Sequence, residues 1–262
     1  MTGFPGGTGV SRLRVYDWPG ADGLAGGSPH LHTACTEGYL VLAGTGTAET
    51  LCGSGYTETP LTPGGLLWFT PGTVHRLVNI SGDLQVLAIM QNGLPNAADS
   101  VLTFPPAVLA DPVAYERAAS LPPGPGPGGG RPGTGNAWAE AARQRRDLAV
   151  EGYLLLREHV IADGPAALRS LHVAAARLVR SQAAKWLEQW REGPLAQAIR
   201  TGEQLHELAA GRGDHLAQSA AYRVDPPPGP DGWGMCGRLE TWDIDRGYPA
   251  FESTLDWSAA DD

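Results

Sequence analysis

The sequence predicts a mainly β N-terminal half followed by an α-helical C-terminal extension. Residues 11–102 hold short β-rich runs broken by glycine and proline, for example 38–44, 65–70 and 83–91. Short runs at close, regular spacing with turn signals between them are typical of an all-β sandwich or barrel. Beyond residue 136 the apolar residues recur at helical spacing instead,.

Two predicted turns and one long stretch rich in proline and glycine divide the chain. Gly53-Ser54-Gly55 predicts a hairpin turn, and Pro63-Gly64-Gly65 predicts another turn,. The stretch 121–136 is rich in proline and glycine and offers few apolar side chains to bury, which indicates a flexible loop or linker,. We therefore expect a barrel over 1–120, a loop or linker over 121–136 and a helical extension over 137–262.

The extension is expected to form three helices, over 137–161, 165–191 and 194–210. In the second of them the apolar residues fall near one face: Leu168, Leu171, Ala175, Leu178, Trp186 and Trp190,. This pattern favours a small helical bundle packed against the barrel. Residues 235–244 alternate in character and form a candidate edge strand that returns to the barrel.

Composition excludes several classes of function. The hydrophobic fraction of 42% predicts a packed core, and the net charge of −9 argues against nucleic acid or an anionic membrane as a main partner,. The three cysteines are few and widely spaced, as in a cytoplasmic protein with reduced thiols,. No signal peptide or membrane-spanning run is visible. Schiff-base chemistry would need Lys185, which lies in a predicted helix far from the motifs.

Four residues form a candidate metal site. His30 and His32 alternate on one strand and therefore point to the same side,. A bend after them can bring Glu37 back to that side, and His75 follows a Pro-Gly turn that starts another strand. Three imidazoles and one carboxylate suit one divalent metal ion, namely Fe, Mn, Zn, Ni, Co or Cu. The alternative is that these residues pack or contact a ligand without holding a metal.

The same residues resemble the two motifs of the cupin superfamily. The first motif, G-x5-H-x-H-x(3,4)-E-x6-G, is matched at His30, His32, Glu37 and Gly44, with Leu24 in the leading slot beside Gly23. The second, G-x5-P-x-G-x2-H-x3-N, is matched at Gly64, Gly72, His75 and Asn79, with Thr70 in the proline slot beside Pro71. The resemblance spans roughly residues 12–105. It implies a cupin-type jelly-roll β-barrel with the metal at the base of a small pocket, and a homodimer.

Three functions remain open from the resemblance. The first is a metal-dependent isomerase or epimerase acting on a small oxygen-rich molecule such as a sugar or hydroxy-carbonyl compound. The second is an Fe(II)-dependent dioxygenase, and the third is a non-catalytic barrel that binds a small molecule. Tyr39 and Glu37 are the candidate catalytic residues, because alternation places Tyr39 on the inward side with Glu37.

The other polar residues are expected to be surface or packing residues. By alternation from His75, Arg76 is expected to face outward as a solvated charge. Glu240 is interpreted as an exposed charge on the late strand, with a general acid/base as the speculative alternative. The isolated histidines of the helical part are interpreted as surface or packing residues: His159, His172, His206 and His215.

Overall fold

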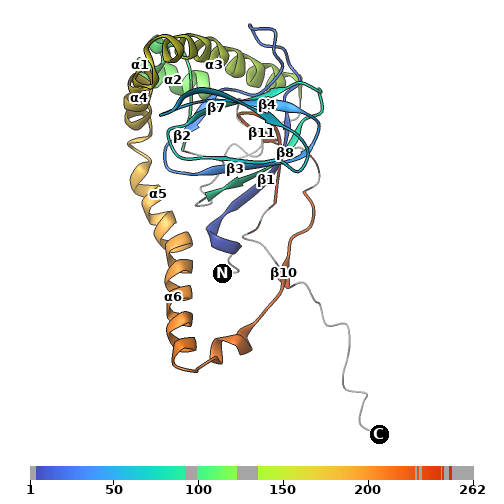
Figure 1. Ribbon diagram of the computed structural model, residues 1–262, viewed down its shortest axis with the longest axis vertical. Coiled ribbons are helices and arrows are strands. Elements are labelled where there is room, and N and C mark those ends of the chain that lie inside the picture. Colours follow the sequence, from blue (N-terminus) through green and yellow to red (C-terminus); the bar gives the residue numbers. More distant parts are fainter. Residues whose placement is uncertain are drawn as a thin grey trace.

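Two facing antiparallel sheets form the N-terminal part of this computed structural model (Figure 1). The structure describes residues 4–91, 99–122, 135–227, 229, 232–242, 244 and 248–249. The strands are β1 (Gly9–Val15), β2 (His30–His32), β3 (Glu37–Ala43), β4 (Gly46–Cys52), β5 (Gly55–Leu61), β6 (Leu66–Phe69), β7 (Val74–Asn79), β8 (Gln85–Met90), β9 (Ser100–Leu102), β10 (Tyr222–Arg223), β11 (Gly232–Trp233), β12 (Gly237–Thr241) and β13 (Tyr248–Pro249).

The strand order is that of a jelly roll, as the sequence predicts. One sheet runs β11-β12-β1-β8-β3-β6, the other runs β5-β4-β7-β2-β9, and β10 pairs with β13 separately. The turn at residues 53–54 joins β4 to β5, and the turn around 63–65 joins β5 to β6, so both predicted turns are confirmed. Neighbours in the sheets are distant in sequence, which is how the two histidine segments come together.

The interior between the sheets is apolar. Inward-facing side chains of both sheets form one buried cluster: Leu13, Val15, Tyr39, Val41, Ala48, Leu61, Phe69, Leu77, Leu84, Val86, Ala88 and Cys236. Alternate positions along a strand share a face, so β3 contributes Tyr39 and Val41 to this cluster together with Glu37 on the same side,. The cluster forms the walls around the polar site described below.

The helices are α1 (Pro106–Ala110), α2 (Pro112–Ala119), α3 (Asn136–Asp163), α4 (Arg169–Val179), α5 (Ala183–Trp190) and α6 (Ala196–Ala209). The segment expected as a single helix over 165–191 is interrupted by a turn at 180–182 that neither glycine nor proline marks. Pro194 does not start a helix; it lies inside a π-helical turn, η5 (Arg191–Leu195), because proline lacks the N–H that an α-helix needs there,. No helix in the described ranges combines the length and apolarity needed to cross a membrane.

The long helix α3 covers the outer face of the five-stranded sheet (Figure 1). A second apolar core lies between them, with Leu31, Leu51 and Val74 from the strands against Ala149 and Tyr153 from the helix. The helix approaches so closely that a Cβ on Gly152 would lie 2.1 Å from the Thr103 carbonyl oxygen. Glycine is therefore required at this position of α3.

The expectation that Arg76 is a solvated surface charge is wrong. Its side chain does face outward from the barrel, but it is fully buried because α3 lies over this face of the sheet. Its guanidinium pairs with Asp22 at 2.5 Å and with Glu49 at 3.4 Å. Arg157 of α3 also pairs with Glu49, at 3.2 Å. Alternation predicted the direction of the side chain and could not reveal the helix above it.

The late strand returns to the barrel, and Glu240 on it is buried rather than exposed. β12 pairs with β1 along its length, with Arg12 opposite Glu240 in the register. The Glu240 carboxylate lies 2.8 Å from Arg14 and 3.4 Å from Arg12 on the outer face of the sheet. The interpretation of Glu240 as an exposed charge is therefore wrong, and its position on the outer face separates it from the barrel interior.

Replacing Arg76 with alanine is expected to lower the free energy of unfolding by about 3 kcal/mol, because it removes the cation that pairs with Asp22 and leaves Glu49 with Arg157 alone,. Urea unfolding followed by circular dichroism measures this loss. Arg143→Ala, at an exposed position of α3, is the matched control and should cost less than about 0.5 kcal/mol. Equal effects of the two changes would contradict the buried network.

Candidate metal centre

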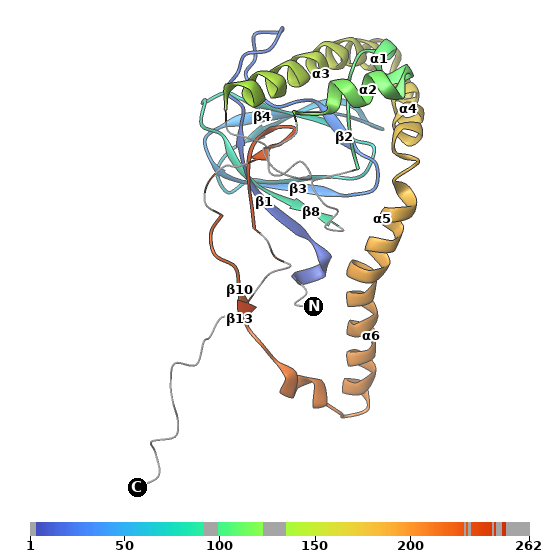
Figure 2. The same ribbon diagram turned by 180° about the vertical axis from the view of Figure 1, so that it is seen from behind.

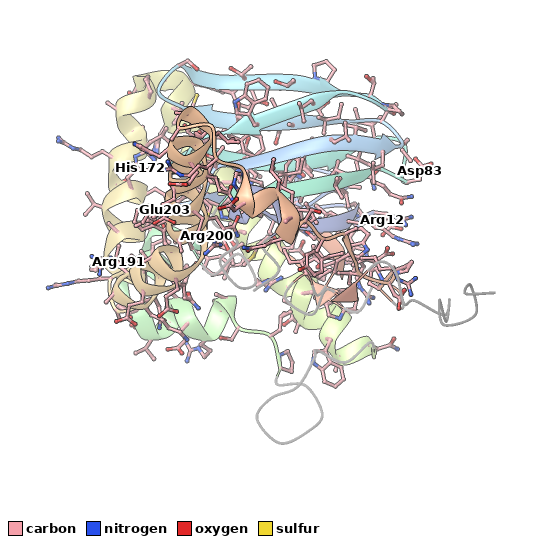
Figure 3. The ribbon with its side chains drawn as sticks, turned by 90° about the horizontal axis from the view of Figure 1, so that it is seen from below. Arg12, Asp83, His172, Arg191, Arg200 and Glu203 are labelled. Carbon is pink, nitrogen blue, oxygen red and sulfur yellow. The ribbon has the colours of Figure 1, made fainter. Side chains whose placement is uncertain are left out.

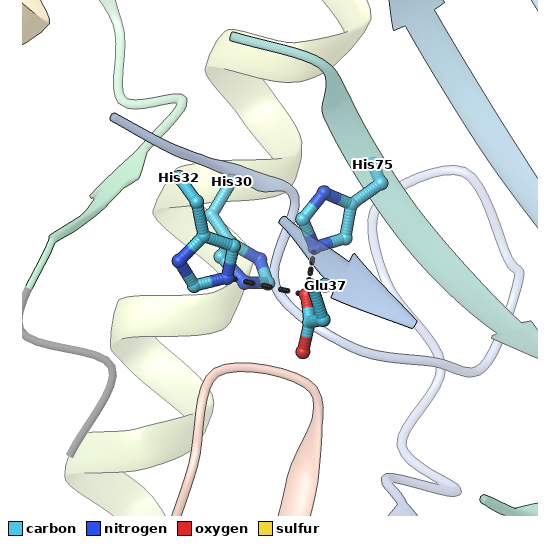
Figure 4. A group of neighbouring side chains, drawn as sticks. All are labelled: His30, His32, Glu37 and His75. Atoms are coloured by element: carbon cyan, nitrogen blue, oxygen red, sulfur yellow. Dashed lines mark ion pairs between the residues drawn. The ribbon is translucent and has the colours of Figure 1, made fainter. Parts of the chain in front are cut away.

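Four side chains from three strands meet inside the barrel (Figure 4). His30 and His32 lie on β2, Glu37 begins β3, and His75 is the second residue of β7. His30 stands directly opposite His75 in the sheet register. Each of the four is buried, with 1–6% of its surface exposed. The site predicted from the sequence therefore comes together in space.

A tight loop returns the chain from His32 to Glu37. Asp99, which precedes β9, accepts hydrogen bonds from the backbone N–H groups of Ala34 and Cys35 at 2.9 and 2.8 Å. These bonds hold the loop closed, so that Glu37 starts its strand on the same side of the barrel as the two histidines. The sequence pattern carried no signal for Asp99, which is distant from the loop along the chain.

The ligand atoms of the four residues converge on one point. All lie within 4.8 Å of one another. The Glu37 carboxylate oxygen Oε2 is 3.2 Å from His32 Nε2 and 3.0 Å from His75 Nε2. Two donor atoms each about 2.1 Å from a metal ion and at right angles to each other would lie about 3 Å apart. The observed spacing fits adjacent ligands of a single ion.

Hydrogen bonds on the far side of each ring determine which nitrogen faces that point. Nδ1 of His30 lies 2.9 Å from the Ser28 carbonyl oxygen, and Nδ1 of His75 lies 3.2 Å from that of Thr73. A carbonyl oxygen can only accept, so each Nδ1 carries a hydrogen and Nε2 of each ring faces inward. Nδ1 of His32 contacts the Asp99 carboxylate at 3.0 Å in the same way.

The inward atoms lack partners of their own. Within the described part of the chain, Nε2 of His32, Nε2 of His75 and Oε2 of Glu37 are buried and have no hydrogen-bond partner. Buried lone pairs that face one another at 3 Å repel unless a cation or a proton lies between them. The donor set therefore fits a metal ion, and these four residues could hold one.

In the absence of a metal ion, the pKa values of the site residues shift in different directions. Burial and the neighbouring imidazoles lower the pKa of His30 well below its usual value. Burial also disfavours the charged form of His32, but its contacts with the carboxylates of Asp99 and Glu37 outweigh burial and raise its pKa to about 9. Although burial opposes ionisation of Glu37, its contacts with His32 and His75 hold its pKa well below the usual range. Any metal ion that binds must displace the proton on His32.

Two further side chains line the interior next to the site. Tyr39 is 1% exposed, and burial together with the nearby Glu37 carboxylate raises the pKa of its hydroxyl well above the usual value. Cys236, from the turn between β11 and β12, places its Sγ 4.0 Å from His30 Nδ1. Burial raises the pKa of this thiol, so it is neutral. Sequence reasoning missed Cys236, because it lies 206 residues from His30 and belongs to no motif whose spacing could indicate a contact.

Helices α4 and α5 pack against the loops at the ligand end of the barrel. Trp186 of α5 forms a small buried cluster with Cys35 from the loop before Glu37. His172 of α4 contacts the Gly72 carbonyl oxygen, in the turn before His75, at 2.9 Å. This contact agrees with the interpretation of His172 as a packing residue. The C-terminal half thus supports the loops that present two of the four candidate ligands.

Comparison with known proteins agrees with this architecture. Residues 18–90 match the family model described as the cupin domain. Among the curated proteins, none matches this chain.

Several solved structures contain a similar barrel. One is a conserved protein with a double-stranded β-helix domain from Klebsiella pneumoniae, 23% identical over 33% of this chain and 69% of that chain, with a TM-score of 0.27. Another is a predicted oxalate decarboxylase from Thermotoga maritima, 20% identical over 31% of this chain and 64% of that chain, with a TM-score of 0.26. A sugar 3,4-ketoisomerase from Thermoanaerobacterium thermosaccharolyticum is 12% identical over 35% of this chain and 64% of that chain, with a TM-score of 0.29. The matches cover about two thirds of each of these proteins.

In the metal-free protein, the imidazole of His32 is expected to titrate near pH 9. Asp99→Asn keeps an oxygen acceptor for Nδ1 but removes the charge, and should therefore move the titration to lower pH. NMR observation of the histidine ring signals across the pH range tests both statements. A His32 titration that does not respond to Asp99→Asn would contradict the role assigned to that carboxylate.

Proposed function

With a cupin domain at residues 18–90 as the premise, we propose that this protein is a divalent-metal-dependent enzyme acting on a small oxygen-rich molecule. The proposed reaction is an isomerisation or epimerisation of a sugar or hydroxy-carbonyl compound. The observation that carries the proposal is the convergence of buried, unpartnered Nε2 and carboxylate atoms on one point inside the barrel.

His30, His32, Glu37 and His75 would hold the ion. Nδ1 of each histidine contacts Ser28, Asp99 or Thr73. These contacts fix the orientation of the three rings before an ion binds,. When bound, the ion supplies Lewis acidity, which polarises a substrate oxygen and acidifies the adjacent C–H group. Four protein ligands leave positions for water or substrate on an octahedral ion.

Tyr39 is the described interior residue best suited to handle a proton on the substrate. Its raised pKa keeps the hydroxyl protonated at neutral pH, so it donates a hydrogen bond or a proton to a substrate oxygen rather than acting as a base,. It lies beside Glu37, on the same face of β3. Glu240 of β12 does not add a carboxylate here, because it pairs with Arg12 and Arg14 on the outer face of the sheet.

Buried apolar and aromatic side chains surround the four candidate ligands. The Phe69 ring stacks on His75 with their centroids 4.3 Å apart, and the Cys236 Sγ lies 4.0 Å from His30 Nδ1. Electrostatic interactions are stronger in such an enclosed, apolar setting than in water. We also propose a cytoplasmic location, which the small number and wide spacing of the cysteines support,, and the homodimer that the resemblance to cupins implies.

Metal content is the first test. The protein purified without added metal or chelator is expected to carry about one equivalent of a divalent ion by elemental analysis. His75→Ala should lose most of it, because one of the four ligands is removed. His206→Ala, which changes an exposed histidine of α6, is the matched control and should retain the ion. Full occupancy in His75→Ala would overturn the proposed ligand set.

The identity of the bound metal distinguishes among the three candidate functions. Manganese, zinc, cobalt or nickel supports the isomerase or epimerase. Iron together with substrate-dependent oxygen consumption would replace it with the Fe(II) dioxygenase. Absence of metal, even after reconstitution, would leave a barrel that binds a small molecule without catalysis.

Tyr39→Phe is expected to lower kcat by about 10²–10⁴-fold while leaving the metal content unchanged. The measurement is NMR detection of deuterium entering substrate C–H positions in D2O, across a panel of sugars and hydroxy-carbonyl compounds. Tyr153→Phe removes an equally buried hydroxyl outside the barrel interior and should leave turnover unchanged. Full activity in Tyr39→Phe would remove Tyr39 from the mechanism.

A further inference from the structure

The candidate metal centre lies near one end of the barrel. Glu37 begins β3, and in the sheet register it stands between Phe69, the last residue of β6, and Met90, the last residue of β8. Residues directly opposite each other on antiparallel strands point to the same side, so Met90 faces inward as Glu37 does. Val86 and Ala88, at alternate positions before Met90, belong to the interior cluster and agree with this direction. These last residues of the strands form the rim of the barrel, which we call the mouth of the site.

Trp186 of α5 covers this mouth. Its side chain is buried in a cluster with Cys35, and Met90 packs against the pair. Cys35 lies in the loop that leads into Glu37, and Met90 stands opposite Glu37. The indole therefore lies at the end of the barrel where the candidate ligands gather.

The arrangement of the helices agrees with this position. From opposite viewpoints, Figures 1 and 2 show α4 and α5 beside one end of the barrel. Seen from below, His172 of α4 and Arg191, which follows α5, lie on one side of the barrel, whereas Asp83 lies on the other (Figure 3). Asp83 precedes β8 and Met90 ends it, so the helices stand at the Met90 end.

The site is closed in this conformation. Each of the four candidate ligands exposes 6% of its surface or less. A sugar or hydroxy-carbonyl compound is larger than a water molecule, so it reaches these side chains only after part of the cover moves. Any function of this site that involves a small molecule therefore requires an opening.

The attachment of α5 and α6 to the barrel is slight. Two buried residues anchor α4, whereas among the described residues Trp186 alone is buried in α5 and none is buried in α6. Pro194, between α5 and α6, also lies close to Gly7, where an added Cβ would come within 2.7 Å of the proline ring. Segments with few buried contacts open at a lower free energy than the core. The exposed turn at 180–182, which joins α4 to α5, can thus act as a hinge while α4 stays in place.

We propose that α5 is a gate over the mouth of the site and that Trp186 is the residue that determines access to it. With the indole against Cys35 and Met90 the interior is closed, and a rotation about the turn at 180–182 opens it. The gate admits a metal ion and a small molecule and, once closed again, excludes bulk water from them. It goes beyond the proposed function, because it concerns access to the site rather than the reaction. It holds equally for a barrel that only binds a small molecule.

Labelling of the cysteine thiols tests the gate in the whole chain, whether or not a metal binds. The rate at which N-ethylmaleimide labels Cys35 is measured by mass spectrometry at urea concentrations below the unfolding transition. Cys236, which is 2% exposed inside the barrel, is the reference for global unfolding. If α5 opens by itself, Cys35 reacts faster than Cys236 and its rate depends less steeply on urea, because the opening exposes less surface. An equal urea dependence of the two thiols would overturn the gate.

Variants of α5 identify the residue that holds the gate closed. Trp186→Ala should raise the labelling rate of Cys35 at least about tenfold, whereas Trp186→Phe, which keeps an aromatic ring, should raise it less. Trp190→Ala changes a tryptophan one turn further along α5 that is 37% exposed, and as the matched control it should leave the rate unchanged. Urea unfolding of each variant verifies that its fold is intact.

Exchange of a metal ion connects the gate to the site. Uptake of Co²⁺ by the metal-free protein, and its release to the chelator dipicolinate, are followed by absorbance. Both rates should rise about tenfold in Trp186→Ala while the affinity for Co²⁺ stays the same, because a gate changes access without changing the ligands. Unchanged rates would overturn the gate, and so would a loss of affinity, which indicates that Trp186 only supports the geometry of the site. A protein that takes up no Co²⁺ would contradict the proposed metal site instead, and the labelling of Cys35 would still decide the gate.

Discussion

The repulsion among buried lone pairs is the constraint on which the site depends. Three imidazoles and one carboxylate face one another within 4.8 Å, away from water. Such a cluster is stable only if protons or a cation occupy its centre. The surrounding structure holds the four side chains close together. Two backbone carbonyls and Asp99 orient the histidine rings, and the apolar side chains around them exclude solvent.

The helical extension contributes to this centre although it provides none of the four candidate ligands. α3 braces the outer face of the ligand-bearing sheet through Arg76 and Tyr153. α4 and α5 support the loops that lead into His75 and Glu37. Arg145 of α3 donates a hydrogen bond to the Gly234 carbonyl oxygen at 2.8 Å and so holds the turn that carries Cys236. Helices α3, α4 and α5 thus contact the strand, loops and turn that surround the site.

The sequence predicted the jelly-roll barrel and the four converging residues, because strand alternation and motif spacing are local properties. It did not predict what covers each face. Arg76 and Glu240 have the expected strand positions, yet both are buried among partners far along the chain. Asp99 and Cys236 were missed for the same reason, since their contacts with the histidines join segments that no local pattern connects. The domain boundaries within 121–136 remain a prediction, because residues 123–134 lie outside the described part of the chain.

The position of β12 beside β1 affects how the protein is made. The Tyr16 hydroxyl donates to the Gly234 carbonyl oxygen, 218 residues away, and β12 fills the sheet next to the first strand. During translation the outer edge of β1 therefore stays unpaired until residues 237–241 have left the ribosome. Long-range pairing of this kind is slow and leaves an open edge prone to association with other nascent chains.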